Sequence, residues 1–245
     1  MTGIIRAEVL QIARSRGILA STLTAVLIAG GLPLILQPPG HGADGAPAAV
    51  VTQATIRTAQ LALITAASLV GGTQFRDGHH GTAVLAVPRR GRLLTAQGIA
   101  AAVWAVPAAT ITSVTAVVLT HALGAPAMAD ADETPGASLL GPGASVASAV
   151  TMYLVLMMVL AWGLALLLRR AWASAAALCT LCAVVPVLSM MIPTAGVLPG
   201  GAGVALLSPY PVALPGGEPW WLVAWAVLGV ATGTVAMLRR DVEGG

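Results

Sequence analysis

The chain contains no lysine, and charged residues of any kind are scarce. Its twelve basic residues are all arginine, and Asp, Glu, Lys and Arg together make up only 9% of 245 residues, whereas 57% are hydrophobic. A soluble domain carries about a quarter charged residues. A chain this poor in charge cannot cover its surface with polar groups, so we expect lipid to be its main solvent.

The missing lysine excludes one class of enzyme. The P-loop of a standard ATPase ends in a lysine whose ammonium group reaches the phosphates of ATP. If ATP drives this protein, ATP and Mg²⁺ must therefore bind to a second polypeptide. No Ser, His and acidic residues are arranged in a way that specifies a nucleophile, so we predict no catalytic residue and no cofactor in this chain.

Metal ligands are equally sparse. The two cysteines, Cys179 and Cys182, lie one helical turn apart in an apolar run, without the further ligands that zinc or redox chemistry requires. We interpret them as reduced thiols packed in the core. His79 and His80 follow Asp77 in a polar stretch, and we interpret them as solvated side chains rather than as a metal site.

Six apolar runs are long enough to cross a bilayer as helices. A span needs about 20 residues, because each residue of a helix rises about 1.5 Å and the hydrocarbon core is about 30 Å thick. The sequence therefore predicts an all-α membrane protein whose residues 1–245 form a single transmembrane domain. The predicted spans are residues 17–36, 50–72, 93–123, 146–168, 171–192 and 220–238. Gly229 and Gly233 in the last run indicate close helix packing within the chain rather than a dimer interface.

The arginines determine the predicted orientation. Placing both termini in the cytoplasm puts eleven of the twelve arginines on the inner side and leaves only Arg57 near the outer side, in agreement with the positive-inside rule. Residues 1–16 then form an amphipathic helix on the inner leaflet, for which a signal peptide is the alternative interpretation. The external segment 193–219 is rich in Gly and Pro but contains an apolar stretch that is too short to cross the bilayer, which suits a re-entrant or interfacial segment.

A polar stripe on the second predicted span has two interpretations. Gln53, Arg57 and Gln60 are spaced by four and three residues, so they share one face of a helix. Arg57 can extend its guanidinium group to the outer headgroups or pair with an external acid. Alternatively, the stripe lines a vestibule that faces the substrate, because ionisable groups near a span tend to face a cavity.

The longest polar interruption, residues 73–92, is predicted to be a cytoplasmic loop. Its most informative segments are QFRDGHHGT at 74–82 and PRRGRLLTAQ at 88–97. Together with the basic amphipathic start and the six spans, these segments resemble the membrane subunit of a type-2 ABC transporter, an exporter-like permease. The resemblance covers the whole chain. It implies that residues 1–16 form the elbow helix, that the segment 193–219 holds re-entrant outer helices, and that the loop contacts a partner ATPase. The coupling residues implied are Phe75, Arg76, Gly81, Thr82, Pro88, Arg89, Arg90 and Arg92.

The resemblance also implies partners and a location. A permease of this family pairs with a second permease subunit, the same chain or a related one, and with two ABC ATP-binding subunits that bind ATP and Mg²⁺. Membrane lipid surrounds it, nucleic acid is not a partner, and the location is the bacterial plasma membrane. The central path implied is lined by Gln53, Arg57, Gln60, Met190 and Met191.

The expected function is thus ATP-driven export of an amphipathic or hydrophobic compound or peptide, with the ATPase on a separate subunit. Two alternatives belong to other classes of protein. One is a membrane scaffold or immunity subunit that transports nothing. The other is an ATP-independent carrier, for which the spans lack the acidic residue that proton-coupled transport requires.

Overall fold

The computed structural model describes residues 2–36, 48–72, 75, 90–123, 142–192, 194, 197–199, 201 and 219–240. Within these residues every regular element is a helix, and no strand occurs. The helices are α1 (Thr2–Arg14), α2 (Arg16–Leu36), α3 (Ala48–Gly72), α5 (Arg90–Ala122), α6 (Pro142–Leu168), α7 (Ala171–Met191) and α8 (Pro219–Arg240).

All helices after α1 are long and apolar enough to cross a membrane, which makes six candidate spans. The prediction of an all-helical chain with six spans is therefore confirmed. The largest difference in helix bounds is at the start of α6, which begins at Pro142 rather than at residue 146. Proline is favoured in the first turn of a helix because its missing N–H has no partner there, so α6 extends back to it.

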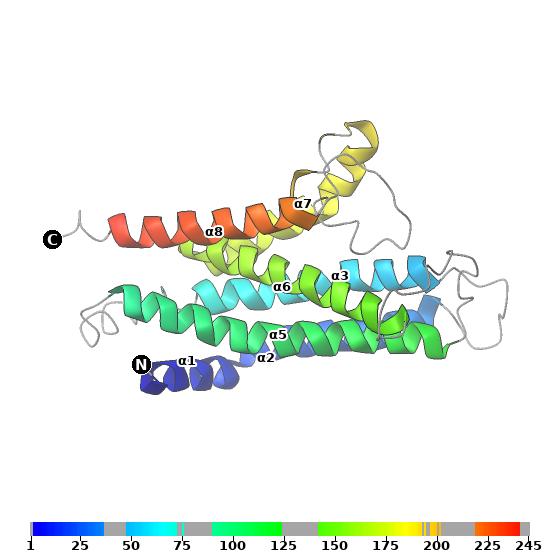
Figure 1. Cartoon of the computed structure of the whole chain (residues 1–245), viewed down its shortest axis with the longest axis horizontal. Helices are drawn as coiled ribbons and strands as arrows, with labels where there is room; N and C mark the ends of the chain where they lie inside the picture. The colour runs from blue at the N-terminus through cyan, green and yellow to red at the C-terminus, as the bar shows by residue number, and fades with distance from the viewer. Residues whose placement is uncertain are drawn as a thin grey trace.

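The six long helices run along the length of a bundle, and α1 lies beside it at one end (Figure 1). The start of α1 and the end of α8 lie at this same end. We call it the basic end, and it consists of α1, the start of α2, the end of α3, the start of α5, the α6–α7 turn and the end of α8. Every described arginine except Arg57 belongs to it.

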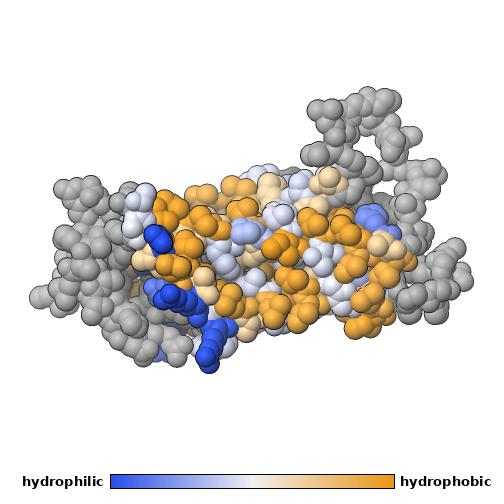
Figure 2. All heavy atoms as spheres, turned by 90° about the horizontal axis from the view of Figure 1, so that it is seen from below, coloured by the Kyte–Doolittle hydropathy of each residue, from blue (hydrophilic) through white to orange (hydrophobic). Residues whose placement is uncertain are grey.

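The surface along the bundle is apolar. Figure 2 shows hydrophobic residues over most of its length and hydrophilic residues gathered towards one end. Large side chains such as Leu27, Val103 and Val227 are exposed there. Exposed apolar surface on this scale is a sign of contact with membrane or protein partners. Six long apolar helices lying side by side are the architecture of a multi-pass membrane protein.

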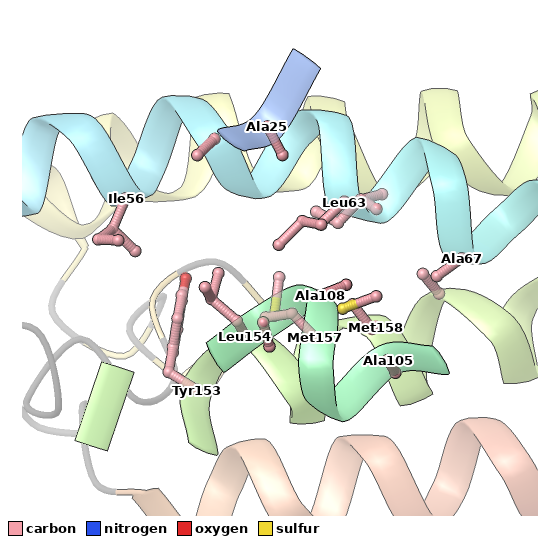
Figure 3. Close-up of a cluster of buried hydrophobic side chains, with 14 of the residues drawn as sticks. Ala25, Ile56, Leu63, Ala67, Ala105, Ala108, Tyr153, Leu154, Met157 and Met158 are labelled. Atoms are coloured by element: carbon pink, nitrogen blue, oxygen red, sulfur yellow. The ribbon is translucent and has the colours of Figure 1, made fainter. Parts of the chain in front are cut away.

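The centre of the bundle is the interface between α3 and α6, the two spans with the largest buried share. Ile56 and Leu63 of α3 pack with Leu154 and Met157 of α6 in one buried cluster (Figure 3). Small alanines of α2 and α5 complete this cluster, because they let the helices approach closely.

The most extensive interface joins α6 and α8. It is built on glycine: a Cβ atom on Gly163 would lie 2.5 Å from the backbone carbonyl carbon of Gly229, and one on Gly233 would collide with the carbonyl oxygen of Gly163. The G-x-x-x-G of Gly229 and Gly233 therefore serves packing within the chain, as predicted.

Candidate functional site

Phe75 connects the start of the 73–92 segment to the turn between α6 and α7. It is the one described residue between α3 and α5. The guanidinium carbon of Arg169 lies 5.7 Å from the centroid of its ring, which is within the range of a cation–π contact. Two segments far apart in the sequence are thus held together at the basic end.

The end of α3 is packed against the same turn without space for another atom. A Cβ atom on Gly72 would lie 2.6 Å from the backbone nitrogen of Ala171, and one on Gly71 would lie 2.9 Å from the carbonyl oxygen of Trp162. Because real side chains do not approach backbone this closely, both positions require glycine. The last turn of α3 therefore lies in backbone contact with α6 and with the start of α7.

Two buried serines connect α3, α6 and α7 by hydrogen bonds about one helical turn further from the basic end. Ser68 of α3 donates a hydrogen bond to Ser174 of α7 over 3.2 Å, and Ser174 donates to the carbonyl oxygen of Ala161 in α6 over 3.0 Å. A buried hydroxyl is costly unless it is hydrogen-bonded. This chain of bonds therefore fixes α3, α6 and α7 in one register.

The connection between α6 and α7 is very short, and Arg169 within it has a left-handed backbone with a φ of 54°. For a residue with a Cβ atom this conformation costs roughly 1–2 kcal/mol. Arg170 follows in an extended conformation, and its carbonyl oxygen accepts the first backbone hydrogen bond of α7 from Ser174. The strained residue is the one that contacts Phe75.

On the other side of the basic end, α1 packs over the bundle. Its buried Ile12 belongs to a cluster with Ile18 of α2 and Leu94 of α5. Nε2 of Gln97 in α5 donates a hydrogen bond to Oε1 of Glu8 over 3.3 Å. Burial raises the pKa of Glu8, and the hydrogen bond from Gln97 partly opposes that rise.

The exposed surface of the basic end is positively charged. Arg6, Arg14 and Arg16 are exposed at α1 and the start of α2, and Arg239 is exposed at the end of α8. Among the described residues Glu8 is the only acid. Such a surface attracts anionic headgroups or an acidic protein partner.

The predicted coupling residues are only partly described. Arg90 and Arg92 lie in the first turn of α5, in a stretch whose side chains are not described, while Arg76, Gly81, Thr82, Pro88 and Arg89 lie outside the described residues. Asp77, His79 and His80 lie outside them as well. In the described part of the chain, no group of three or more His, Cys, Asp or Glu could hold a metal ion.

The predicted path residues lie on α3 and α7. Gln53 and Arg57 are half-buried, whereas Gln60 is buried and its Oε1 accepts a 2.7 Å hydrogen bond from the hydroxyl of Tyr153 in α6. Met191 is exposed, and Met190 lies in α7 with a side chain that is not described. The structure thus brings Gln60 to the helix interface, and the substrate path stays a prediction.

Both cysteines are free thiols in α7, as predicted, and Cys182 is buried. Of the predicted re-entrant segment 193–219, residues 194, 197–199 and 201 are described, together with residue 219, which begins α8. Nε1 of Trp225 in α8 donates a 2.7 Å hydrogen bond to the carbonyl oxygen of Val197. The rest of the segment lies outside the described residues.

The sequence reasoning did not single out three residues that now stand out: Arg169, Tyr153 and Glu8. Each left a signal in the sequence. Arg169 lies between two apolar runs with almost no linker, Tyr153 is an isolated tyrosine within a span, and Glu8 is the lone acid of the first helix. Their partners come from distant helices, so the pairing required the fold.

A scan against protein-family models finds no match, and a search of the curated proteins finds none either. The class that the fold defines is a multi-pass membrane protein, with six candidate spans in the described part of the chain. The residues and their geometry are therefore the basis on which we propose its activity.

Proposed function

We propose that the chain is the permease subunit of an ATP-driven exporter of the type-2 ABC class in the bacterial plasma membrane. It pairs with a second permease subunit and with two ATP-binding subunits, which supply ATP and Mg²⁺. The cargo is an amphipathic or hydrophobic compound or peptide. The chain itself performs no hydrolysis and converts closure of the ATPase into movement of its helices.

The observation that carries this proposal is the contact of Phe75 with Arg169. A coupling element has to be attached firmly to the helices it moves. Here the start of the 73–92 segment is attached to the α6–α7 turn through Phe75, and the end of α3 is packed on Ala171. A push on this segment would therefore reach α3, α6 and α7 as a unit.

The positive charge at the basic end supports the orientation in which this end faces the cytoplasm. It also provides the kind of surface on which an acidic patch of a partner ATPase would dock. The predicted path residues on α3 and α7 lie on two helices that this unit contains, so movement of the unit would change the wall of the path.

Replacing Arg89, Arg90 and Arg92 with Ala is expected to reduce ATP-driven export at least about tenfold, because loss of docking charges at an interface costs more than about 1.4 kcal/mol. Co-purification with the candidate ATPase and transport into inverted vesicles measure the two effects. The triple Arg6, Arg14 and Arg16 to Ala variant removes equal charge from α1 and the start of α2 at the same end, and it should lose less export than the loop variant if the loop arginines do the coupling. Unchanged assembly and export in the first variant would contradict the coupling role.

The contact of Phe75 with Arg169 can be tested by a double-mutant cycle with Phe75→Leu and Arg169→Gln. We expect each single variant to uncouple ATP hydrolysis from export several-fold, since a cation–π contact contributes about 0.5–2 kcal/mol. The double variant should be no worse than the worse single one. Additive losses in the ratio of export to hydrolysis would show that the two side chains act separately.

Stimulation of ATP turnover by the cargo separates the exporter from a scaffold or immunity subunit. The reconstituted complex should hydrolyse ATP faster when a transported compound is added, and a scaffold should show no such response. An ATP-independent carrier gains no support from the spans, because the described part of α2, α3 and α5–α8 contains no Asp or Glu.

A further inference from the structure

A small cavity lies beneath α1 at the basic end, and the proposed transport function does not use it. Its volume is about 80 Å³, and it is lined by Glu8, Gln11, Ile12, Ser15, Ile18, Val70 and Gln97. One water molecule needs roughly 10–15 Å³ of such space. The cavity therefore has room for a group larger than a single water.

One oxygen atom in the polar lining of this cavity, Oε1 of Gln97, accepts no hydrogen bond from a described residue. Gln97 is only 6% exposed, and its Nε2 donates to Oε1 of Glu8. Its Oε1 is buried and has no hydrogen-bond partner among the described residues. An orphaned amide oxygen is costly away from water, so this end of Gln97 calls for a donor that the described side chains do not provide.

The lining also carries a negative charge that nothing described neutralises. Glu8 makes no ion pair with any described side chain, and Arg6 and Arg14 of its own helix are exposed. Burial raises the pKa of Glu8 because the carboxylate is poorly solvated there. A cation in the cavity would stabilise the ionised carboxylate.

We propose that this cavity binds a primary ammonium group, R–NH₃⁺. Its single positive charge matches the one carboxylate, and its three N–H groups can donate to Glu8, to Oε1 of Gln97 and to a third oxygen on Gln11 or Ser15. The apolar part of the lining, formed by Ile12, Ile18 and Val70, suits the methylene next to the nitrogen. A Ca²⁺ ion would take six to eight oxygen ligands, more than the side chains of this lining provide.

An ethanolamine headgroup of a membrane lipid fits both the chemistry and the position. The cavity lies where α1 meets the ends of the long helices, and an amphipathic helix with exposed arginines lies at headgroup level. The exposed Arg14 and Arg16 near the same end of α1 would favour the phosphate of the same lipid. A free amine shares the ammonium chemistry, and the experiment separates the two sources.

The test uses the full chain purified in detergent, with thermal unfolding and native mass spectrometry as readouts. The ligands are phosphatidylethanolamine, phosphatidylcholine, phosphatidylglycerol, free ethanolamine and sodium chloride. We expect phosphatidylethanolamine to bind and to raise the unfolding temperature, and phosphatidylcholine, whose quaternary nitrogen has no N–H, to do neither. Glu8→Gln should weaken this binding about tenfold or more, since it removes a charged hydrogen bond. Arg6→Gln, which changes a charge outside the cavity, should retain it.

Gln97→Lys supplies a second, independent variant. Its ammonium group would occupy the cavity from within, next to Glu8, so this variant should be more heat-stable than the wild type without added lipid and should no longer respond to phosphatidylethanolamine. A response to free ethanolamine as well would identify a site open to soluble amines. Equal binding of phosphatidylcholine, equal protection by sodium chloride, absence of any amine binding, or full binding by Glu8→Gln would each overturn the proposal.

Discussion

Alanine at Gly163 should destabilise the protein, although alanine is the better helix former. In a helix that has room for a methyl group, Gly→Ala stabilises by about 1 kcal/mol. At Gly163 the added Cβ atom would lie 2.5 Å from the backbone of Gly229. Backbone cannot rotate away as a side chain can, so α6 and α8 would have to separate along their most extensive interface. Overpacking costs about 1–3 kcal/mol or more, and we expect a net loss of about 2 kcal/mol.

Gly31 provides the matched control for this experiment. It lies inside α2, and a Cβ atom built on it meets nothing within 4 Å. Gly31→Ala should therefore leave the unfolding temperature unchanged or raise it slightly, whereas Gly163→Ala should lower it by several degrees. Thermal unfolding in one detergent compares the two variants directly. Equal effects of the two substitutions would mean that α6 and α8 are not in backbone contact.

Leucine at Gln60 should destabilise the bundle, and a second substitution should restore it. Gln60→Leu removes the acceptor of the hydroxyl of Tyr153, a hydrogen bond of 2.7 Å in the buried core between α3 and α6. An unpaired buried hydroxyl costs about 1–3 kcal/mol. Removing the hydroxyl as well, by Tyr153→Phe, should return most of that stability, because positions 60 and 153 then leave no unpaired polar group between the two helices.

The same pair of variants tests whether Gln60 lies on the substrate path. If its role is to hold α3 against α6, export by the rescued double variant should match the wild type for every cargo. A double variant that is stable yet altered in cargo preference would place Gln60 on the path. Unfolding temperature and transport must therefore be measured on the same preparations, and a double variant as unstable as Gln60→Leu would contradict the paired role.

The sequence predicted the long helices well, because a run of apolar residues bounded by arginine or by Gly and Pro is a local signal. The end of α3 at Gly72 was predicted correctly, whereas the start of α6 was predicted at residue 146, four residues after Pro142. The sequence also identified Gln60 as one of three polar residues on a shared helix face. It could not identify Tyr153 as the partner, because nothing local relates residue 60 to residue 153.

The candidate site was less predictable for the same reason. Phe75 was selected by a family-like motif, but its contact with Arg169 depends on how α3 meets the α6–α7 turn. The left-handed backbone of Arg169 gave no signal, since an arginine is not expected in that conformation. The hydrogen bond from Gln97 to Glu8 likewise depends on the packing of α1 against α5, a tertiary arrangement that composition and periodicity do not determine.

The glycine contact between α6 and α8 has a consequence for biosynthesis. Gly163 is synthesised before Gly229 and Gly233, and α7 and the segment that follows it are made in between. Until α8 enters the membrane, the groove around Gly163 faces lipid or a chaperone rather than its partner helix. The backbone contact between α6 and α8 is therefore among the last to form, and a chain interrupted before residue 219 leaves Gly163 without its partner helix.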